Sequence, residues 1–186
     1  ERQLRILDAG CGTGLCGAVL APYAKTLTGV DLSAGMIAAA KQLAIYDALI
    51  KEEITEFTSR NHQTFDMVVM ADTLIYFGSL KTVFAAISYA LNMGGLFVFS
   101  IEDGSGYAKN MGSKLNCNGR YSHKTSYVLD VLKDNGFSLL SITPHMLRME
   151  LGNPVDGMLV MAIKGSKFHR SRLSLRRKPH SHPPFT

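Results

Sequence analysis

The sequence has no tryptophan, only three cysteines and six prolines, and no apolar run long enough to cross a membrane. A membrane-spanning helix needs about 20 predominantly apolar residues, and the most apolar segment, L-F-V-F-S-I, is far shorter. The first residues, E-R-Q-L-R, lack the architecture of a signal peptide. Cys11, Cys16 and Cys117 are odd in number and lack zinc-ligand spacing, which indicates a reducing compartment; Cys11 and Cys16 are expected to be small residues packed near a glycine-rich turn and not a redox pair. We therefore expect a cytoplasmic protein that binds no metal.

Acidic residues are missing from residues 164–186, which hold seven lysines and arginines. The whole chain carries a formal charge of +5, so the rest of the sequence is slightly acidic. A basic, proline- and histidine-containing segment of this kind is typical of a solvated extension. We expect one domain over residues 1–164 and a basic, disordered tail over residues 165–186. Nucleic-acid binding is then limited to weak contacts through that tail.

Apolar segments with strand character alternate with segments of helical periodicity along most of the chain. The expected strands are Leu4–Asp8, Thr26–Asp31, Ala48–Glu53, Phe65–Asp72, Leu96–Ile101, Phe137–Met149 and Met158–Lys164. The expected helices are Leu15–Ala24, Ala34–Ala44, Ser79–Asn92 and Thr125–Asn135, the last closed by Gly136. The pair Gly94-Gly95 is expected to end the connection before the fifth strand, and residues 102–124 are expected to form a long functional connection. This order predicts a parallel sheet covered on both faces, with a terminal antiparallel hairpin.

Four of the expected strands end in an acidic residue, namely Asp8, Asp31, Glu53 and Asp72. Ligands of open parallel sheets bind beyond the carboxyl ends of the strands. The sequence therefore predicts a ligand site along this edge, lined with carboxylates.

A glycine-rich turn, D-A-G-C-G-T-G, joins the first strand to the first helix. Glycines permit positive φ angles and let a ligand approach the backbone, and the helix that follows presents unpaired N–H groups. One register, Gly12 to Gly17, also matches the dinucleotide pattern G-x-G-x-x-G. The strand ends too early for that pattern, however, and Asp8 would repel a pyrophosphate. A ligand with an ammonium and a sulfonium group, such as S-adenosylmethionine, fits the charge better.

The turn resembles the D/E-x-G-x-G-x-G signature of class I S-adenosylmethionine-dependent methyltransferases, and V-D-L-S resembles the second signature of that family. The resemblance covers residues 3–164 and implies a Rossmann-like, doubly wound α/β fold. Its mostly parallel seven-stranded sheet has the order 3-2-1-4-5-7-6, with strand 7 antiparallel and helices on both faces. More narrowly, Y-D-A-L-I, A-D-T-L-I-Y-F and L-R-M-E-L-G-N-P-V-D-G resemble bacterial predicted methyltransferases that often carry TPR repeats ahead of this domain. Because the sequence starts at the first strand, we expect the cap helices of such proteins to be missing.

The resemblance also implies roles for particular residues. The backbone of the turn would lie beside the methionine and ribose, with Asp8 near the ammonium group, and Asp31 would accept hydrogen bonds from both ribose hydroxyls. Leu32 and Met36 would either pack on the adenine or belong to the core. Glu53, with Glu52 as an adjacent rival, would contact the adenine amino group. The complete set of expected cofactor residues is Asp8, Gly10, Cys11, Gly12, Gly14, Asp31, Leu32, Met36, Glu53, Ile54, Ala71 and Asp72, with Leu74 also near the methyl group.

The catalytic residues are not identified by a diagnostic motif. Asp72, Tyr76 and His123 are weak candidates for a base, and Tyr107, Arg120, Tyr121 and His123 are weak candidates for substrate contacts. His123 would equally suit a cap on the helix that begins near Thr125. The N-P-P-W/F tetrapeptide of amino methyltransferases is replaced by A-D-T-L.

The function expected from these features is in-line transfer of a methyl group from S-adenosylmethionine to an unidentified acceptor, most simply a small molecule, with a protein acceptor as an alternative. A nicotinamide-dependent oxidoreductase and a non-catalytic cofactor-binding or interaction module are the other hypotheses.

Overall fold

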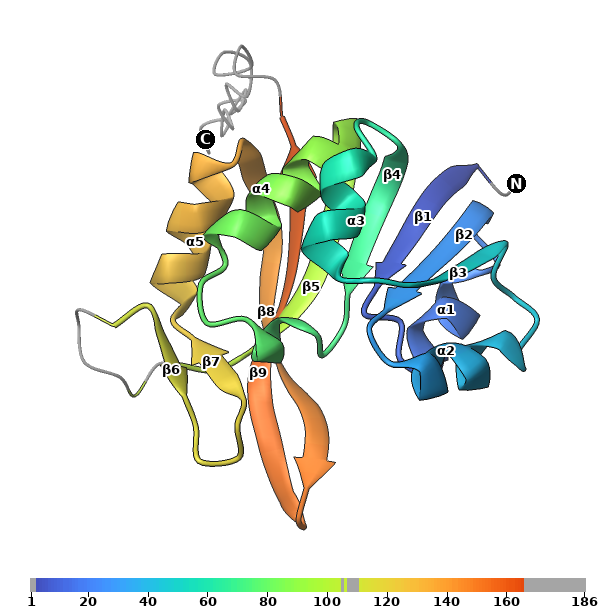
Figure 1. Cartoon of the computed structure of the whole chain (residues 1–186). Helices are drawn as coiled ribbons and strands as arrows, with labels where there is room; N and C mark the ends of the chain where they lie inside the picture. Colours follow the sequence, from blue (N-terminus) through green and yellow to red (C-terminus); the bar gives the residue numbers. More distant parts are fainter. Residues whose placement is uncertain (1–2, 105, 107–110, 166–186) are drawn as a thin grey trace, which may run out of the picture.

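The computed structural model describes residues 3–104, 106 and 111–165, and it contains one large mixed sheet and one small hairpin (Figure 1). The strands are β1 (Leu4–Ala9), β2 (Ala24–Asp31), β3 (Ala48–Lys51), β4 (Phe65–Met70), β5 (Leu91–Glu102), β6 (Ser113–Leu115), β7 (Tyr121–His123), β8 (Phe137–Glu150) and β9 (Asn153–Lys164). The helices are α1 (Leu15–Leu20), α2 (Ala34–Lys41), α3 (Ile54–Arg60), the 3-10 turn η1 (Leu74–Tyr76), α4 (Lys81–Ala90) and α5 (Thr125–Asp134).

The large sheet has seven strands in the order β3-β2-β1-β4-β5-β9-β8. The first five strands pair in parallel, whereas β9 is antiparallel to both β5 and β8. Counting only these strands, the order is 3-2-1-4-5-7-6, with the last strand inserted antiparallel beside the fifth. The fold class and the strand order expected from the sequence are therefore confirmed.

Helices cover both faces of the sheet, and the strands alternate between two apolar clusters. In β1, Leu7 faces the main core, whereas Ile6 faces a smaller cluster on the side of α1. Helices α3, α4 and α5 lie next to one another over the main core (Figure 1). There Phe84 of α4 packs edge-on against Phe97 and Phe99 of β5, with ring centroids 5.1 and 5.2 Å away. This packing fixes the parallel strands whose carboxyl ends form the site.

Helix α3 and the early start of β5 differ from the sequence expectation. The segment I-T-E-F-T-S-R is short and polar, but the Glu53 side chain caps it by accepting a hydrogen bond from the Glu56 N–H at 2.8 Å. Strand β5 begins at Leu91, which pairs with Phe65, so the expectation that Gly94-Gly95 ends the connection is wrong. Gly94 instead adopts a φ of 78° where the register with β4 shifts.

The connection between β5 and α5 contains the antiparallel hairpin β6–β7, which the sequence did not indicate. Strands of three residues are too short to produce a recognisable period. The expected helix after it is confirmed as α5, and Gly136 adopts a φ of 80° just beyond its end, as predicted.

Strands β8 and β9 are longer than expected, because the predicted eight-residue link is mostly strand. Only Leu151 and Gly152 form the turn, both with positive φ angles of 49° and 80°. The expected tail over residues 165–186 lies outside the described residues except for Gly165. Within the part of the chain that the structure describes, none of the helices combines the length and apolar character needed to cross a membrane.

Candidate cofactor site

The glycine turn leaves β1 at the carboxyl edge of the sheet and enters α1. Gly10, Gly12 and Gly14 all have positive φ angles, of 81°, 54° and 92°. A Cβ atom on Gly10 would lie 2.4 Å from Thr73 Oγ1, so this glycine is required by space as well as by conformation. The N–H groups of Gly10 and Cys11 donate to the Val30 carbonyl at 2.8 and 3.0 Å, which anchors the turn to β2. The turn is thus a fixed cradle.

Asp31 ends β2 and joins the turn to the start of α2. Its Oδ2 accepts a hydrogen bond from the Gly12 N–H at 3.0 Å, and its Oδ1 accepts one from the Ser33 N–H at 2.8 Å. Each carboxylate oxygen keeps a further lone-pair direction for a ligand. Asp31 is therefore held beside the turn in one orientation, at the end of the strand.

Asp8 has a different position from the one expected. Only 1% of its surface is exposed, and its Oδ2 accepts a hydrogen bond from the Tyr46 hydroxyl at 2.7 Å. Burial raises the pKa of the Asp8 carboxyl to about 6, against the opposing effect of hydrogen bonds from Tyr46 and the Gly17 N–H. The expectation that this carboxylate lies open to a ligand ammonium is corrected, since the side chain lies beneath the turn. Because side chains alternate between the two faces along β1, the Asp8 side chain lies on the same face as Ile6, the face covered by α1.

Cys11 is buried in the turn, and the surroundings of Cys11 and Cys16 make both thiols unreactive. Burial, together with the Asp8 carboxylate, raises the pKa of Cys11 to about 12 and that of Cys16 to about 11. All three cysteines are free. For Cys11 and Cys16, the geometry supports the expected packing role.

The residues expected around the adenine lie beyond β2 and β3. Leu32 and Met36 are 65% and 43% exposed, which excludes a core role for either. The Glu53 carboxylate caps α3 and also accepts a hydrogen bond from the Thr55 hydroxyl at 3.1 Å. Its rival Glu52 forms an ion pair with Arg60 at 2.6 Å. Ile54 is buried beneath Glu53 in the main core.

The end of β4 lies against the glycine turn. The Thr73 hydroxyl is within hydrogen-bond distance of the Ala9 carbonyl, 3.2 Å, and of the Ala71 carbonyl, 3.0 Å. Asp72 has a positive φ of 52°, an unusual conformation for a residue with a side chain, and its N–H donates to Ser100 Oγ at 2.8 Å. Ala71 and Asp72 are exposed, whereas Leu74, expected near the methyl group, is fully buried in the core.

Comparison with known proteins agrees with this arrangement of turn, acidic strand ends and sheet order. A family model described as a methyltransferase domain matches residues 7–99, half of the chain. The chain belongs to this methyltransferase-domain family. Its sheet is that of class I S-adenosylmethionine-dependent methyltransferases.

Two curated relatives and two solved structures illustrate the likeness. A ubiquinone biosynthesis O-methyltransferase of Klebsiella pneumoniae is 27% identical over 108 residues, 56% of this chain and 45% of the relative. A probable S-adenosylmethionine-dependent methyltransferase of Saccharomyces cerevisiae is 27% identical over 141 residues, 73% of this chain and 48% of the relative. The chain thus spans about half the length of the curated relatives it matches.

The solved structures establish the fold of this methyltransferase domain. A methyltransferase of Methanosarcina mazei superposes with a TM-score of 0.73 at 20% identity, over 89% of this chain and 94% of the other. A Burkholderia thailandensis 1,6-didemethyltoxoflavin N1-methyltransferase, solved with S-adenosylhomocysteine, gives 0.69 at 18% identity, over 89% and 72%.

An ion-pair network, which the sequence did not indicate, joins four segments of the methyltransferase domain: the end of β4, the end of β5, the β6–β7 loop and β8. Arg148 of β8 pairs with Asp72 at 2.5 Å, with Glu102, and with Glu150 at 3.0 Å. Arg120, in the β6–β7 loop, pairs with Glu150 at 2.5 Å. Burial raises the pKa of Asp72, although Arg148 and Arg120 oppose that shift. The network could not be predicted from spacing along the chain, since Asp72 and Arg148 are 76 residues apart.

His123 is a structural residue in this domain, which corrects its expected role as a base, substrate contact or helix cap. Its side chain is fully buried, Nε2 lies 2.8 Å from the Phe77 carbonyl, and the ring stacks on Tyr127. Burial lowers the pKa of His123, so the ring is neutral near pH 7 and can donate to that carbonyl. Lys124, which precedes α5 directly, supplies no side-chain cap.

The other candidates differ in accessibility. Tyr76 is two-thirds exposed, and Tyr121 is half-buried and packs against Gly78. The side chain of Arg120 is held by Glu150. Tyr107 lies outside the described residues.

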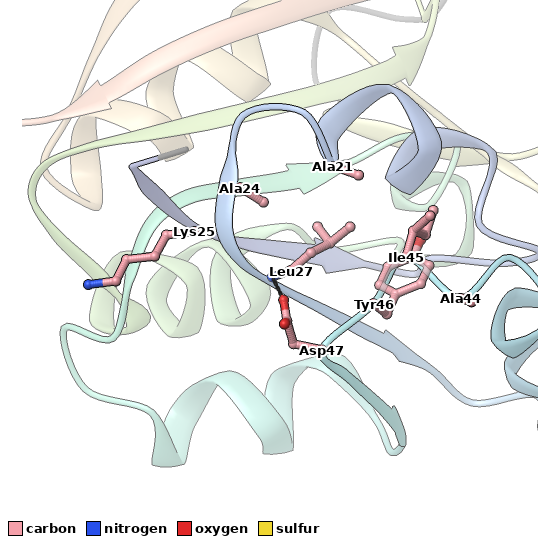
Figure 2. Close-up of a pocket in the computed structure, with 8 residues that line it drawn as sticks. All are labelled: Ala21, Ala24, Lys25, Leu27, Ala44, Ile45, Tyr46 and Asp47. Atoms are coloured by element: carbon pink, nitrogen blue, oxygen red, sulfur yellow. Dashed lines mark hydrogen bonds between the residues drawn. The ribbon is translucent and has the colours of Figure 1, made fainter. Parts of the chain in front are cut away.

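A cavity of about 280 Å³ opens at the other end of the strands (Figure 2). It is lined by Ala21, Ala24, Lys25, Leu27, Ala44, Ile45, Tyr46 and Asp47. The Leu27 N–H donates to Asp47 Oδ2 at 2.7 Å on its wall. Because it borders the amino-terminal half of β2, away from Asp31, we assign it no part of the cofactor site.

Proposed function

We propose that this chain binds S-adenosylmethionine at the carboxyl edge of the sheet and transfers its methyl group to a small-molecule acceptor. The observation that carries the proposal is the fixed pair formed by the glycine turn and Asp31, joined through the Gly12 N–H. Family membership and the strand order support the same cofactor.

Each part of the edge suits one part of the cofactor. The remaining lone pairs of Asp31 accept hydrogen bonds from the two ribose hydroxyls. Because two backbone N–H groups already hold the carboxylate in place, it loses little conformational entropy when the ligand binds. The exposed side chains of Leu32 and Met36 pack on the adenine ring. Glu53, next to Ile54, lies at the adenine edge, with its carboxylate already engaged in the cap of α3.

The methionine part of the cofactor lies over the backbone of the glycine turn, Gly10, Cys11, Gly12 and Gly14. It points its methyl group toward Ala71 and Asp72, which are exposed at the end of β4. The acceptor then binds beyond β4 and β5, beside Arg148 and its carboxylate partners.

Methyl transfer is a displacement at the sulfonium carbon, so holding the acceptor in line supplies much of the catalysis. A base is required only when the acceptor loses a proton in the reaction. Asp72 suits that role best, because it is nearly half exposed and burial raises its pKa above the usual range of an aspartate. Tyr76 is a second exposed group near the same edge.

A small-molecule acceptor is supported by the relatives, which include proteins named for ubiquinone biosynthesis and for didemethyltoxoflavin methylation. We also propose a cytoplasmic, reducing location, supported by the three free thiols.

Calorimetric titration tests the cofactor assignment. We expect saturable binding of S-adenosylmethionine and of its product S-adenosylhomocysteine, and none of NAD. Replacement of Asp31 by Ala should abolish the binding, whereas Asp130→Ala, an exposed aspartate on α5, should leave it unchanged. Binding of NAD without S-adenosylmethionine would contradict the proposal.

The acceptor is then sought by incubating the chain with metabolite extracts and S-adenosylmethionine carrying a labelled methyl group. A labelled product that is lost with Asp31→Ala identifies the acceptor pool. If Asp31→Ala abolishes binding but the chain labels neither small molecules nor proteins, a non-catalytic cofactor-binding module replaces the enzyme.

A further inference from the structure

Tyr46 lies between α2 and β3, outside the glycine turn and the acidic strand ends that characterise the site. Its ring packs against the small apolar cluster of Ile6, Ala24 and Leu27 on the sheet face covered by α1. Figure 2 shows Tyr46 together with Leu27 and Ala24. From there its hydroxyl reaches Asp8 at 2.7 Å, directly beneath the turn. Tyr46 therefore contacts Asp8 and the turn from the side of the sheet that α1 covers.

Three glycines leave the space that Tyr46 occupies. A Cβ atom on Gly17 would lie 2.0 Å from the Tyr46 hydroxyl oxygen, and one on Gly29 would lie 2.9 Å from a ring carbon. A Cβ atom on Gly14 would lie 3.2 Å from the same ring. These glycines belong to the turn, to α1 and to β2, so all three elements close around one aromatic side chain. Only Gly14 also needs its glycine for a positive φ angle.

Asp8 is a buried charge whose orientation depends on this contact. The Tyr46 hydroxyl and the Gly17 N–H are the hydrogen-bond donors that favour its ionised form. The other titratable groups near it are Asp31, which acts on Asp8, and Cys11 and Cys16, on which Asp8 acts. Of these, Asp31 opposes ionisation of Asp8, and the two thiols remain neutral at physiological pH. The hydroxyl of Tyr46 is thus the side-chain donor that keeps a carboxylate beneath the glycine turn.

We infer that Tyr46 is a positioning residue for the cofactor: it holds the Asp8 carboxylate, and with it the glycine turn, in the arrangement that receives S-adenosylmethionine. The inference rests on the function proposed above. Tyr46 does not touch the cofactor, because Asp8 and the backbone of the turn lie between them. Its ring sets the separation of the turn, α1 and β2, and its hydroxyl maintains the negative charge that attracts the cationic sulfonium cofactor.

The two contributions are separated by two substitutions. Tyr46→Phe keeps the ring and removes the hydroxyl, whereas Tyr46→Leu also removes the aromatic packing. Tyr89→Phe is the matched control, because Tyr89 is a partly exposed tyrosine on α4 whose ring contacts that of His62. Asp8→Asn removes the charge itself.

The measurement is the affinity for S-adenosylmethionine, determined by calorimetry between pH 5 and pH 8, with the thermal midpoint recorded for each variant. Wild-type affinity should fall as the pH decreases through about 6, where Asp8 takes up a proton. In Tyr46→Phe the loss of the hydroxyl disfavours the ionised form, so the transition moves to higher pH and the affinity at pH 7 falls roughly fivefold. In Asp8→Asn the transition near pH 6 should disappear, which separates it from any transition of Asp72.

Tyr46→Leu should weaken binding further at every pH, and Tyr89→Phe should match the wild type. A purely structural role would lower the thermal midpoint of Tyr46→Phe without moving the pH transition, and that result would overturn the inference. Unchanged affinity and an unchanged transition in Tyr46→Phe would overturn it as well. A wild-type chain that binds no S-adenosylmethionine would instead refute the proposed function, and the inference with it.

Discussion

Replacement of Gly17 by Ala tests the packing beneath the glycine turn most directly. In a helix, Gly→Ala ordinarily stabilises by up to about 1 kcal/mol. Here the new methyl group would lie 2.0 Å from the Tyr46 hydroxyl oxygen and 2.4 Å from Cζ. The ring would have to move by more than about 1 Å to restore ordinary contacts. That displacement breaks the 2.7 Å hydrogen bond to Asp8.

The two costs act together. Overpacking a tight site costs about 1–3 kcal/mol, and a lost hydrogen bond to a charged group costs about 1.5–3 kcal/mol. Allowing for the gain in helix propensity, we expect Gly17→Ala to lower the free energy of unfolding by about 3 kcal/mol. For a domain of this size the thermal midpoint should fall by roughly 6–12 °C.

Urea denaturation and thermal melting measure both quantities. Gly35→Ala is the matched control, because Gly35 lies in α2 and its Cβ atom would meet only Ser33 Oγ at 3.8 Å. This control should be neutral or slightly stabilising. In the double variant Gly17→Ala/Tyr46→Ala the two effects should be strongly non-additive, because the alanine then enters the space that the ring has left.

A stabilising or neutral Gly17→Ala would refute this account of the turn. Full additivity with Tyr46→Ala would refute it too, since the methyl group and the ring would then not compete for the same space.

Three further predictions concern charged residues. Asp8→Asn should stabilise the fold at pH 7.5 while weakening cofactor binding. The pKa of Asp8 is about 6 in the folded state against 3.8 unfolded, so ionisation of Asp8 lowers the free energy of unfolding as the pH rises through that window, by at most about 3 kcal/mol. Urea titrations of the wild type and the variant at pH 4 and 7.5 measure this difference. A wild-type advantage at pH 7.5 would contradict it. Arg148→Met should destabilise by about 2–3 kcal/mol, because Glu102 is left buried without its partner, and adding Glu102→Gln should recover part of that loss. No recovery would show that the arginine acts through packing alone. Asp31→Ala should lower the thermal midpoint, because the Gly12 and Ser33 N–H groups lose their acceptor, but the variant should remain folded at 25 °C and bind S-adenosylmethionine at least tenfold more weakly by calorimetry; an unchanged affinity would place the ribose elsewhere.

The arrangement of the sheet could be read from the sequence because its signals are local. Alternating strand and helix patterns, and acids at successive strand ends such as Asp31, depend on residues that are neighbours in the chain. The resemblance then added the inserted last strand, which periodicity alone gave only as an antiparallel hairpin. Helix α3 and the hairpin β6–β7 were missed, because short polar elements carry no period and are stabilised by caps and contacts with distant residues.

The candidate site likewise contains residues that the sequence located and residues whose roles only the structure revealed. The glycine turn and Asp31 could be located because their spacing along the chain follows from the strand–turn–helix geometry itself. The orientation of Asp8, the role of His123 and the pairing of Asp72 with Arg148 depend on which side chains meet across the fold. A sequence specifies the face of a strand on which a carboxylate lies, but not the tyrosine or arginine that folding brings to it.

The sequence by itself therefore determined the fold class and the edge of the sheet where the cofactor is expected, and its resemblance to class I methyltransferases implied the family and the strand order. Only the tertiary structure decided that the first acid of the glycine signature is a buried group supported by Tyr46. The reason is physical: a turn is specified by backbone conformations within a few residues, whereas the state of a buried charge is set by packing between β1, α1 and the segment before β3.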